Sequence, residues 1–136
     1  MYYFIVNPNS RSGRGGSIWS EIHRQLKLRG ISFQYCLTRY SGHATSIAKK
    51  ASCLGTSEDP ISIIAVGGDG TIHEVLSGIT DFDHVIFGYI PTGSGNDFCR
   101  SMELPSDPME SLEYILSAER IGTMDVPCLS GVKKDS

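Results

Sequence analysis

The run 67–71, Gly-Gly-Asp-Gly-Thr, holds the residues whose types and spacing point most directly to chemistry. It follows the apolar stretch 61–66, typical of a buried strand, and leads into 72–76, which has a helical pattern. Glycines at such a junction allow positive φ and let an anion approach the main-chain N–H groups, while the helix points its positive end at the same place. The run therefore predicts a phosphate-binding loop. A plain turn needs fewer glycines and leaves Asp69 unexplained.

Three further loops of similar chemistry follow apolar stretches. The loop 91–100 is rich in glycine, hydroxyl and amide side chains and contains Asp97. The loop 7–16 combines Asn and Ser side chains with Arg11 and Arg14, which could surround a phosphate or an adenine, although its composition also suits a solvated surface loop. Thr38 follows the apolar stretch 31–37, where a helix N-terminal hydroxyl is as good an interpretation as a ligand contact.

Strands and helices are predicted to alternate along the chain. The expected strands are 2–6, 31–37, 61–66 and 85–90, and the intervening stretches carry apolar residues at helical spacing. Gly30 is expected just past the end of the first helix, and Asp107 with Pro108 at the start of the last. This order predicts a three-layer α/β/α domain with a mostly parallel sheet, in which ligands bind at the carboxyl ends of the strands.

Length and composition exclude several classes of protein. With 136 residues and a net charge of −3, the chain is expected to form one domain, and no cluster of Lys and Arg suggests a nucleic-acid binder. The four cysteines are scattered without a CxxC pair, which argues against a structural zinc site and for a reducing compartment. The apolar stretch 2–6 is too short for a signal peptide or a membrane span, so we expect a cytoplasmic protein.

These motifs, in their order and spacing, resemble the diacylglycerol-kinase-type catalytic domain of lipid kinases. The segments that carry the resemblance are 7–8, 67–71, 74–75, 91–98 and 124–126. The Gly-Asp-Gly-Thr element alone is less specific, because NAD kinases and phosphofructokinases have a similar one. The loop Pro-Thr-Gly-Ser-Gly-Asn-Asp-Phe at 91–98 favours the lipid-kinase branch. The resemblance implies a nucleotide-binding fold of the phosphofructokinase and NAD-kinase type.

The resemblance also implies ATP and Mg²⁺ as cofactors and transfer of the γ-phosphate to the hydroxyl of diacylglycerol or a related lipid. The residues implied in nucleotide binding are Asn7, Asn9, Ser10, Thr38, Gly67, Gly68, Asp69, Gly70, Thr71, His73, Gly93 and Ser94. Three acids, Asp69, Asp97 and Asp125, fall where the family keeps catalytic acids that organise Mg²⁺ through water. Mg²⁺ prefers oxygen ligands and keeps several waters, which suits this arrangement, although each acid could instead cap a helix.

The chain departs from the family pattern at three places. His73 stands where the family usually has Asn, and Arg11 and Ser12 lengthen the first loop. Family members continue beyond the position of Asp125 into a second, β-rich domain that builds the lipid cleft and supplies the catalytic base. We therefore expect residues 1–136 to be the N-terminal ATP-binding domain, with the lipid acceptor and any peripheral membrane contact provided through the second domain. The apolar surface left for that domain predicts self-association.

Two other functions stay open at this point. One is a different small-molecule kinase of the same superfamily, such as an NAD kinase, against which the loop 91–98 argues. The other is a non-catalytic module that binds nucleotide or docks a partner, which a short chain without a catalytic base would suit. Because the residues that contact the acceptor lie mostly beyond this sequence, the identity of the lipid cannot be predicted from it.

Overall fold

The structure, a computed structural model, describes residues 1–80, 83–92 and 108–120, with the backbone alone for residues 10–12 and 118–120. Strands and helices alternate along these residues, as the sequence predicts. In chain order the elements are β1 (Tyr2–Val6), α1 (Ser10–Leu28), β2 (Phe33–Leu37), α2 (His43–Ser52), β3 (Ile61–Gly67), α3 (Asp69–Gly78), β4 (Val85–Pro91) and α5 (Pro108–Arg120).

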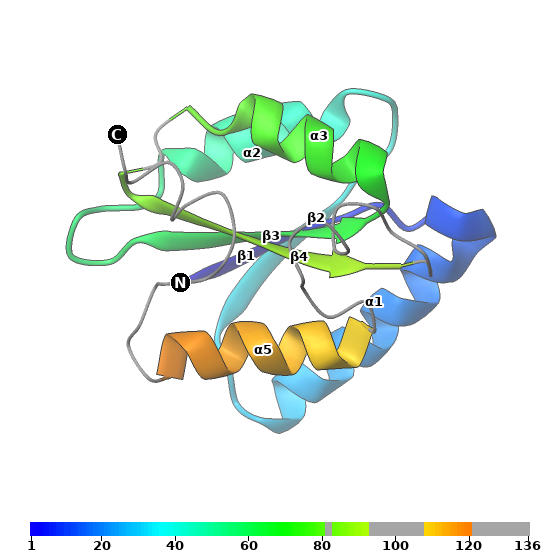
Figure 1. Ribbon diagram of the computed structural model, residues 1–136, viewed down its shortest axis with the longest axis horizontal. Coiled ribbons are helices and arrows are strands. Elements are labelled where there is room, and N and C mark those ends of the chain that lie inside the picture. The colour runs from blue at the N-terminus through cyan, green and yellow to red at the C-terminus, as the bar shows by residue number, and fades with distance from the viewer. Residues whose placement is uncertain (81–82, 93–107, 121–136) are drawn as a thin grey trace.

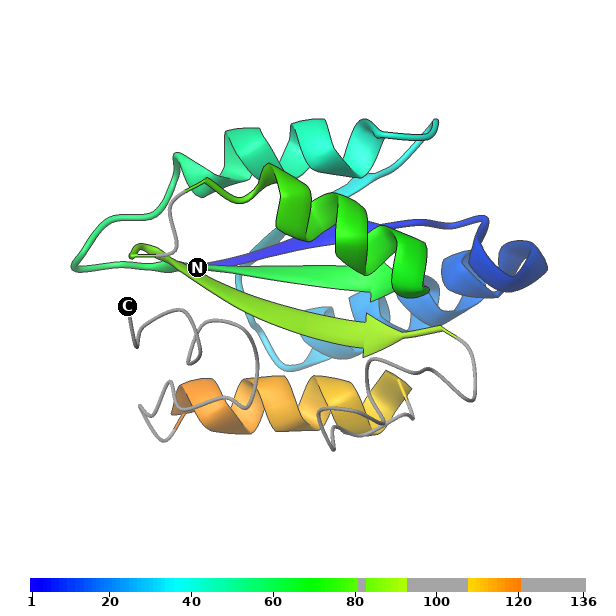
Figure 2. The ribbon, with the colours of Figure 1, turned by 45° about the horizontal axis from the view of Figure 1, so that its top comes forward.

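The strands form a four-stranded parallel sheet in the order β2-β1-β3-β4. Tyr2 of β1 pairs with Phe33 of β2 on one side and with Ser62 of β3 on the other. Helices α2 and α3 cover one face, and α1 and α5 cover the other (Figure 1). Turning the molecule shows α3, in green, above β3 and β4, with α5 beneath them (Figure 2). The predicted three-layer α/β/α architecture is confirmed.

The core consists of two apolar layers, one on each face of the sheet. All seven residues of β3 are buried, because this central strand has a strand on either side and a helix layer above and below. Its Ile63 and Ala65 pack under α2 and α3, whereas Ile64 and Val66 face α1 and α5. A strand covered on both faces reads as a continuous apolar run, which is why β3 is the easiest strand to predict from the sequence.

Several predicted boundaries hold, but the strand expected over 31–37 begins two residues later, at Phe33, and one predicted loop is wrong. Gly30 has φ of 69° just past the end of α1, and Pro108 begins α5, as predicted; Asp107 lies outside the described residues. The loop expected over residues 7–16 is wrong, because α1 begins at Ser10. Its glycines lower helix propensity, but the helix is anchored further along where Trp19, Ile22 and Leu26 are buried against the sheet. Only 7–9 connect β1 to α1.

Candidate functional site

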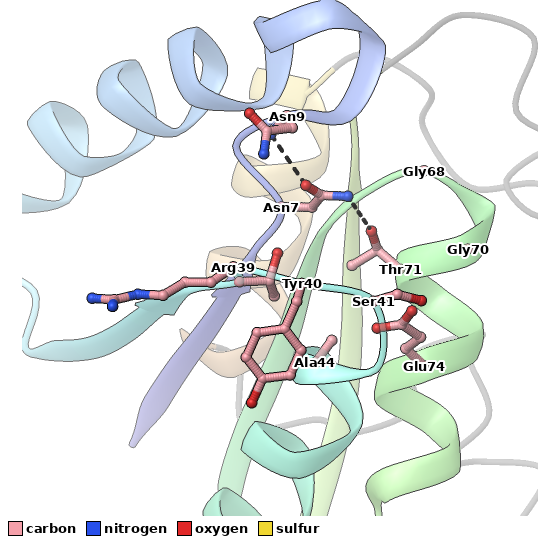
Figure 3. A pocket seen from close by; sticks show the side chains of 11 residues that line it. Asn7, Asn9, Arg39, Tyr40, Ser41, Ala44, Gly68, Gly70, Thr71 and Glu74 are labelled. Atoms are coloured by element: carbon pink, nitrogen blue, oxygen red, sulfur yellow. Dashed lines mark hydrogen bonds between the residues drawn. The ribbon is translucent and has the colours of Figure 1, made fainter.

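A cavity of about 410 Å³ opens at the carboxyl ends of β1, β2 and β3. Because α1 and α3 lie on opposite faces of the sheet, the chain after β1 and the chain after β3 diverge there, as at the ligand-binding switch point of other open parallel sheets. Residues that follow each of the three strands line the cavity (Figure 3). They are Asn7, Asn9, Thr38, Arg39, Tyr40, Ser41, Ala44, Gly68, Gly70, Thr71 and Glu74.

Asn7 connects the ends of β1 and β3 at the floor of the cavity. Its backbone N–H donates to Val66 O (2.9 Å), and its side-chain Nδ2 donates to the hydroxyl oxygen of Thr71 (3.4 Å). Its Oδ1 accepts a hydrogen bond from the backbone N–H of Asn9 (3.1 Å). The side chains of Asn7 and Thr71 consequently face each other, and Asn9 lies next to Asn7 (Figure 3). They gather amide and hydroxyl groups at the beginning of α3.

Gly67 is needed here because the chain approaches itself closely. A Cβ on Gly67 would lie 2.8 Å from the Cβ of Thr71, closer than real side chains approach, so a side chain here would displace the threonine. Gly68 and Gly70 are different, because no atom of the described residues lies within 4 Å of the place where their Cβ atoms would be. Their missing side chains leave open space beside the cavity, which both of them line.

The expectation of positive φ in the run 67–71 is wrong. Gly68 has φ of −100° and ψ of −167°, an extended conformation, and within the described ranges the glycines with positive φ are Gly13, Gly30 and Gly42. The strand therefore passes into α3 without a left-handed residue. What glycine provides in this run is close approach at Gly67 and open space at Gly68 and Gly70.

Helix α3 presents its N-terminus to the cavity. Gly68 is its N-cap and has no side chain with which to cap the helix, so the N-cap residue does not satisfy the first-turn N–H groups in that way. The carbonyl of Gly68 accepts hydrogen bonds from the N–H groups of Thr71 (3.1 Å) and Ile72 (3.2 Å). Uncapped N–H groups and the positive end of the helix dipole favour an anion at this position. Asp69, in the first turn, has an exposed side chain and does not line the cavity.

The opposite wall is the segment between β2 and α2. The ring of Tyr40 stacks on that of His43, with centroids 4.4 Å apart and planes inclined by 14°. The backbone N–H of Arg39 donates to His43 Nδ1 (2.9 Å), which holds the imidazole in place. Tyr40 is 65% exposed, so much of its ring is open to a ligand, whereas the side chain of Arg39 points away from Asn7 and Thr71 (Figure 3).

Glu74 joins this wall to α3. Its carboxylate accepts a hydrogen bond from the backbone N–H of Gly42 (3.1 Å), which is the N-cap residue of α2. Its backbone carbonyl accepts a hydrogen bond from the hydroxyl of Thr45 (2.8 Å). A carboxylate at a helix N-terminus is favourable, so α2 and α3 are fastened together directly beside the cavity. Further along α3, a Cβ on Gly78 would lie 2.9 Å from the Cβ of Ala48, and glycine allows the two helices to pack this closely.

The structure brings together one half of the predicted binding residues. Those that line the cavity are Asn7, Asn9, Thr38, Gly68, Gly70 and Thr71. Gly67 and Asp69 adjoin it without lining it, and His73 is exposed on α3 and does not line it. Ser10 begins α1, with its backbone alone described. Gly93, Ser94, Asp97 and Asp125 lie outside the described residues.

Sequence reasoning missed part of the lining. The missed residues are Arg39, Tyr40, Ser41, Ala44 and Glu74. These residues lie directly after a strand or one turn into the helix that follows it, and this position was the available signal that they line the cavity. Arg14, expected near a phosphate, does not line the cavity; its Nε donates to the carbonyl of Thr92 (3.3 Å).

The described residues do not form a complete metal site. Among the described parts of the chain, no group of three or more His, Cys, Asp and Glu side chains is placed to hold a metal ion. Asp69 is the one member of the expected acidic set within these ranges, since Asp97 and Asp125 fall outside them. Convergence of the three acids stays a prediction.

Comparison with known sequences fits this geometry. The profile of the family described as "Diacylglycerol kinase catalytic domain" matches residues 1–127. The chain belongs to this family. The resemblance seen in its motifs is thereby confirmed, and two of the three chain segments that line the cavity contain the family motifs 7–8 and 67–71.

Relatives in this family come from several bacteria. "Putative lipid kinase YtlR" of Bacillus subtilis is 34% identical over 104 residues, covering 76% of this chain and 33% of its own length. The diacylglycerol kinase of Staphylococcus carnosus is 30% identical over 118 residues, covering 86% of this chain and 37% of its own length. The chain thus spans about a third of the curated relatives that it matches.

Solved structures of the family have the same fold. The crystal structure of a diacylglycerol kinase from Bacillus anthracis is 26% identical and superimposes with a TM-score of 0.66. The match covers 84% of this chain and 38% of that protein. In the described ranges of the present chain, none of the helices is both long and apolar enough to span a bilayer.

Proposed function

We propose that this chain is the nucleotide-binding part of an ATP-dependent lipid kinase, which transfers the γ-phosphate of ATP to the hydroxyl of diacylglycerol or a related lipid. The observation that carries the proposal is the cavity where Asn7, Gly68 and Thr71 meet the uncapped N-terminus of α3. Its volume of about 410 Å³ lies within the usual range of small-molecule sites, about 300–1,000 Å³. Membership of the family supports the kinase assignment.

The chemistry of the lining suits a nucleotide bound in one orientation. The N–H groups at the beginning of α3 and the Asn7 and Thr71 side chains offer hydrogen-bond donors to phosphate oxygens. The exposed ring of Tyr40, stacked on His43, offers an aromatic face to a base at the other wall. The phosphates therefore lie toward Gly68 and Gly70, and the base lies toward Tyr40.

Magnesium fits the donor chemistry in part. Asp69 presents an exposed carboxylate at the start of α3, beside the proposed phosphate position, and hard oxygen donors of this kind suit Mg²⁺. We propose that Asp69, together with Asp97 and Asp125, holds Mg²⁺ through water. When bound, Mg²⁺ would neutralise charge on the phosphates during transfer.

The lipid acceptor is proposed to bind outside this chain. Because the chain spans about a third of its relatives, we propose that residues 1–136 form the ATP-binding domain and that a second, β-rich domain binds the lipid, contacts the membrane and supplies the base. General-base catalysis is worth about two to four orders of magnitude in rate, so the chain alone should transfer phosphate slowly. Self-association is also proposed, since Tyr35 and Leu37 are exposed on the edge strand β2.

A calorimetric titration with ATP, with and without Mg²⁺, tests this function. We expect saturable binding that requires Mg²⁺ and is weakened by Asp69→Asn. Glu58→Gln is the matched control, because Glu58 is an exposed carboxylate before β3, at the opposite end of that strand. Tight binding of NAD in competition with ATP would favour an NAD-kinase-like enzyme. If the folded chain does not bind ATP, the proposed nucleotide-binding function is wrong.

A further inference from the structure

The carbonyl of Gly67 accepts two hydrogen bonds at the edge of the cavity. One comes from the hydroxyl of Tyr89 on β4 (2.9 Å), and the other from the backbone N–H of Thr92 (3.1 Å). Tyr89 is 5% exposed and belongs to the apolar layer beneath α2 and α3. The hydrogen bond from Thr92 continues the regular backbone ladder of the parallel strands β3 and β4. The side-chain hydroxyl of a buried tyrosine is an additional constraint on the same oxygen.

These hydrogen bonds determine where the next N–H group points. The carbonyl of Val66 faces β1, where it accepts from Asn7, and the carbonyl of Gly67 faces β4. In a planar trans peptide the C=O and N–H point in opposite directions, so the N–H of Gly68 points away from β4 and toward the side of Asn7. Gly68 lines the cavity there, and in the described part of the chain its N–H makes no hydrogen bond.

The Gly67–Gly68 peptide needs such a constraint because neither residue carries a side chain. A peptide between two glycines rotates more easily than any other, since no Cβ restricts φ and ψ on either side. Rotated by half a turn, it would aim a carbonyl oxygen instead of an N–H at the cavity. An oxygen in that place would repel an anion, whereas the N–H attracts it.

We propose that Tyr89 is a positioning residue, which holds the Gly67–Gly68 peptide so that Gly68 N–H donates to a phosphate oxygen of the bound nucleotide. The inference rests on the proposed nucleotide function and assigns a role to a buried residue that does not itself line the cavity. The phenylalanine variant Tyr89→Phe preserves the ring in the core and removes only the hydroxyl that reaches Gly67.

The first test needs no ligand. In isotopically labelled, weakly aligned protein, the residual dipolar coupling of Gly68 N–H reports the direction of that bond. We expect Tyr89→Phe to change this coupling while those of β1 and β3 stay as in the wild type. The control is Tyr3→Phe, since Tyr3 also stands on the sheet but makes no hydrogen bond through its hydroxyl in the described part of the chain. An unchanged Gly68 coupling in Tyr89→Phe would overturn the proposal.

The second test compares ATP with adenosine by calorimetry. We expect Tyr89→Phe to weaken ATP binding about three- to tenfold and adenosine binding less than about twofold, because the lost orientation concerns only the phosphates. A purely structural role would affect both ligands alike or neither, and that result would overturn the inference alone. Failure of the wild-type protein to bind ATP would overturn the proposed function and, with it, the phosphate contact of Gly68.

Discussion

The carboxylate of Glu74 on α3 accepts a hydrogen bond from the N–H of Gly42, at the beginning of α2. The two helices cover the same face of the sheet, and this bond lies at the end where both of them border the cavity. The wall that contains Tyr40 is therefore fixed relative to the N-terminus of α3. Affinity for a ligand that spans both walls should depend on this connection.

Replacing Glu74 tests that dependence. Glu74→Ala removes the acceptor, and we expect the free energy of unfolding to fall by about 1 kcal/mol, as for loss of a helix cap. We also expect weaker ATP binding. Glu74→Gln retains an oxygen that can accept from Gly42 and should preserve most of both properties. Urea denaturation and calorimetry measure the two quantities. Equal losses in the Ala and Gln variants would show that the charge, and not the hydrogen bond, matters.

The three glycines of the run 67–71 should respond differently to alanine. Gly67→Ala forces a Cβ against Thr71, and we expect destabilisation of about 1–3 kcal/mol. Gly68→Ala and Gly70→Ala place a Cβ in open space. Gly70→Ala also adds a better helix former, so stability should be unchanged or rise by up to about 1 kcal/mol.

The affinity for ATP should distinguish these glycine variants further. We expect Gly68→Ala and Gly70→Ala to weaken it although both proteins remain stable, because their Cβ atoms would occupy space at the cavity. Thermal denaturation and calorimetry on the same samples give both readings. Wild-type affinity in both variants would mean that phosphate does not lie against this turn.

Asn7→Asp tests the charge preference of the cavity floor. The substitution preserves size and shape but replaces the Nδ2 donor with a carboxylate oxygen, and Thr71 can donate its hydroxyl to that oxygen instead. We therefore expect modest effects on stability but a large loss of affinity for ATP, because a negative charge now faces the phosphates. Adenosine binding should change little. The ATP affinity of Asn9→Asp is a useful comparison, because Asn9 also lines the cavity.

Tyr40 tests the orientation of the nucleotide. Loss of a base-stacking aromatic costs about 1–3 kcal/mol per base, so Tyr40→Ala should weaken ATP binding by about fivefold or more. Tripolyphosphate, which has no base, should bind Tyr40→Ala and wild type equally. Tyr40→Phe retains the ring and should bind ATP normally. A parallel loss for tripolyphosphate would indicate that the phosphates, and not the base, lie near Tyr40.

The sequence predicted the sheet better than it predicted the cavity. Strand β3 was readable because a strand buried on both faces is apolar throughout. The early start of α1 was missed because glycines at 13, 15 and 16 look like a loop, and only tertiary packing of Trp19 and the residues after it supports that helix. Local propensity cannot reveal such packing.

Among the residues that line the cavity, those placed there by helix packing were harder to predict than those in sequence motifs. Asn7 and Thr71 stand in recognisable motifs, and the structure joins them by a hydrogen bond. Tyr40 stands outside these motifs and is brought to the cavity by the packing of α2 on α3, which depends on contacts such as that of Gly78 with Ala48. Contacts between helices that are far apart in sequence leave no local pattern.

The central position of β1 in the sheet affects when the site can form during synthesis. Tyr2 pairs with Ser62 and Val6 with Val66, so β1 must wait for β3 to be translated. At about 5–20 residues per second, that delay is about 3–12 seconds, during which the apolar strand β1 has no partner on that side. Because the cavity is built on the junction of these two strands, a nascent chain cannot bind nucleotide before the delay ends.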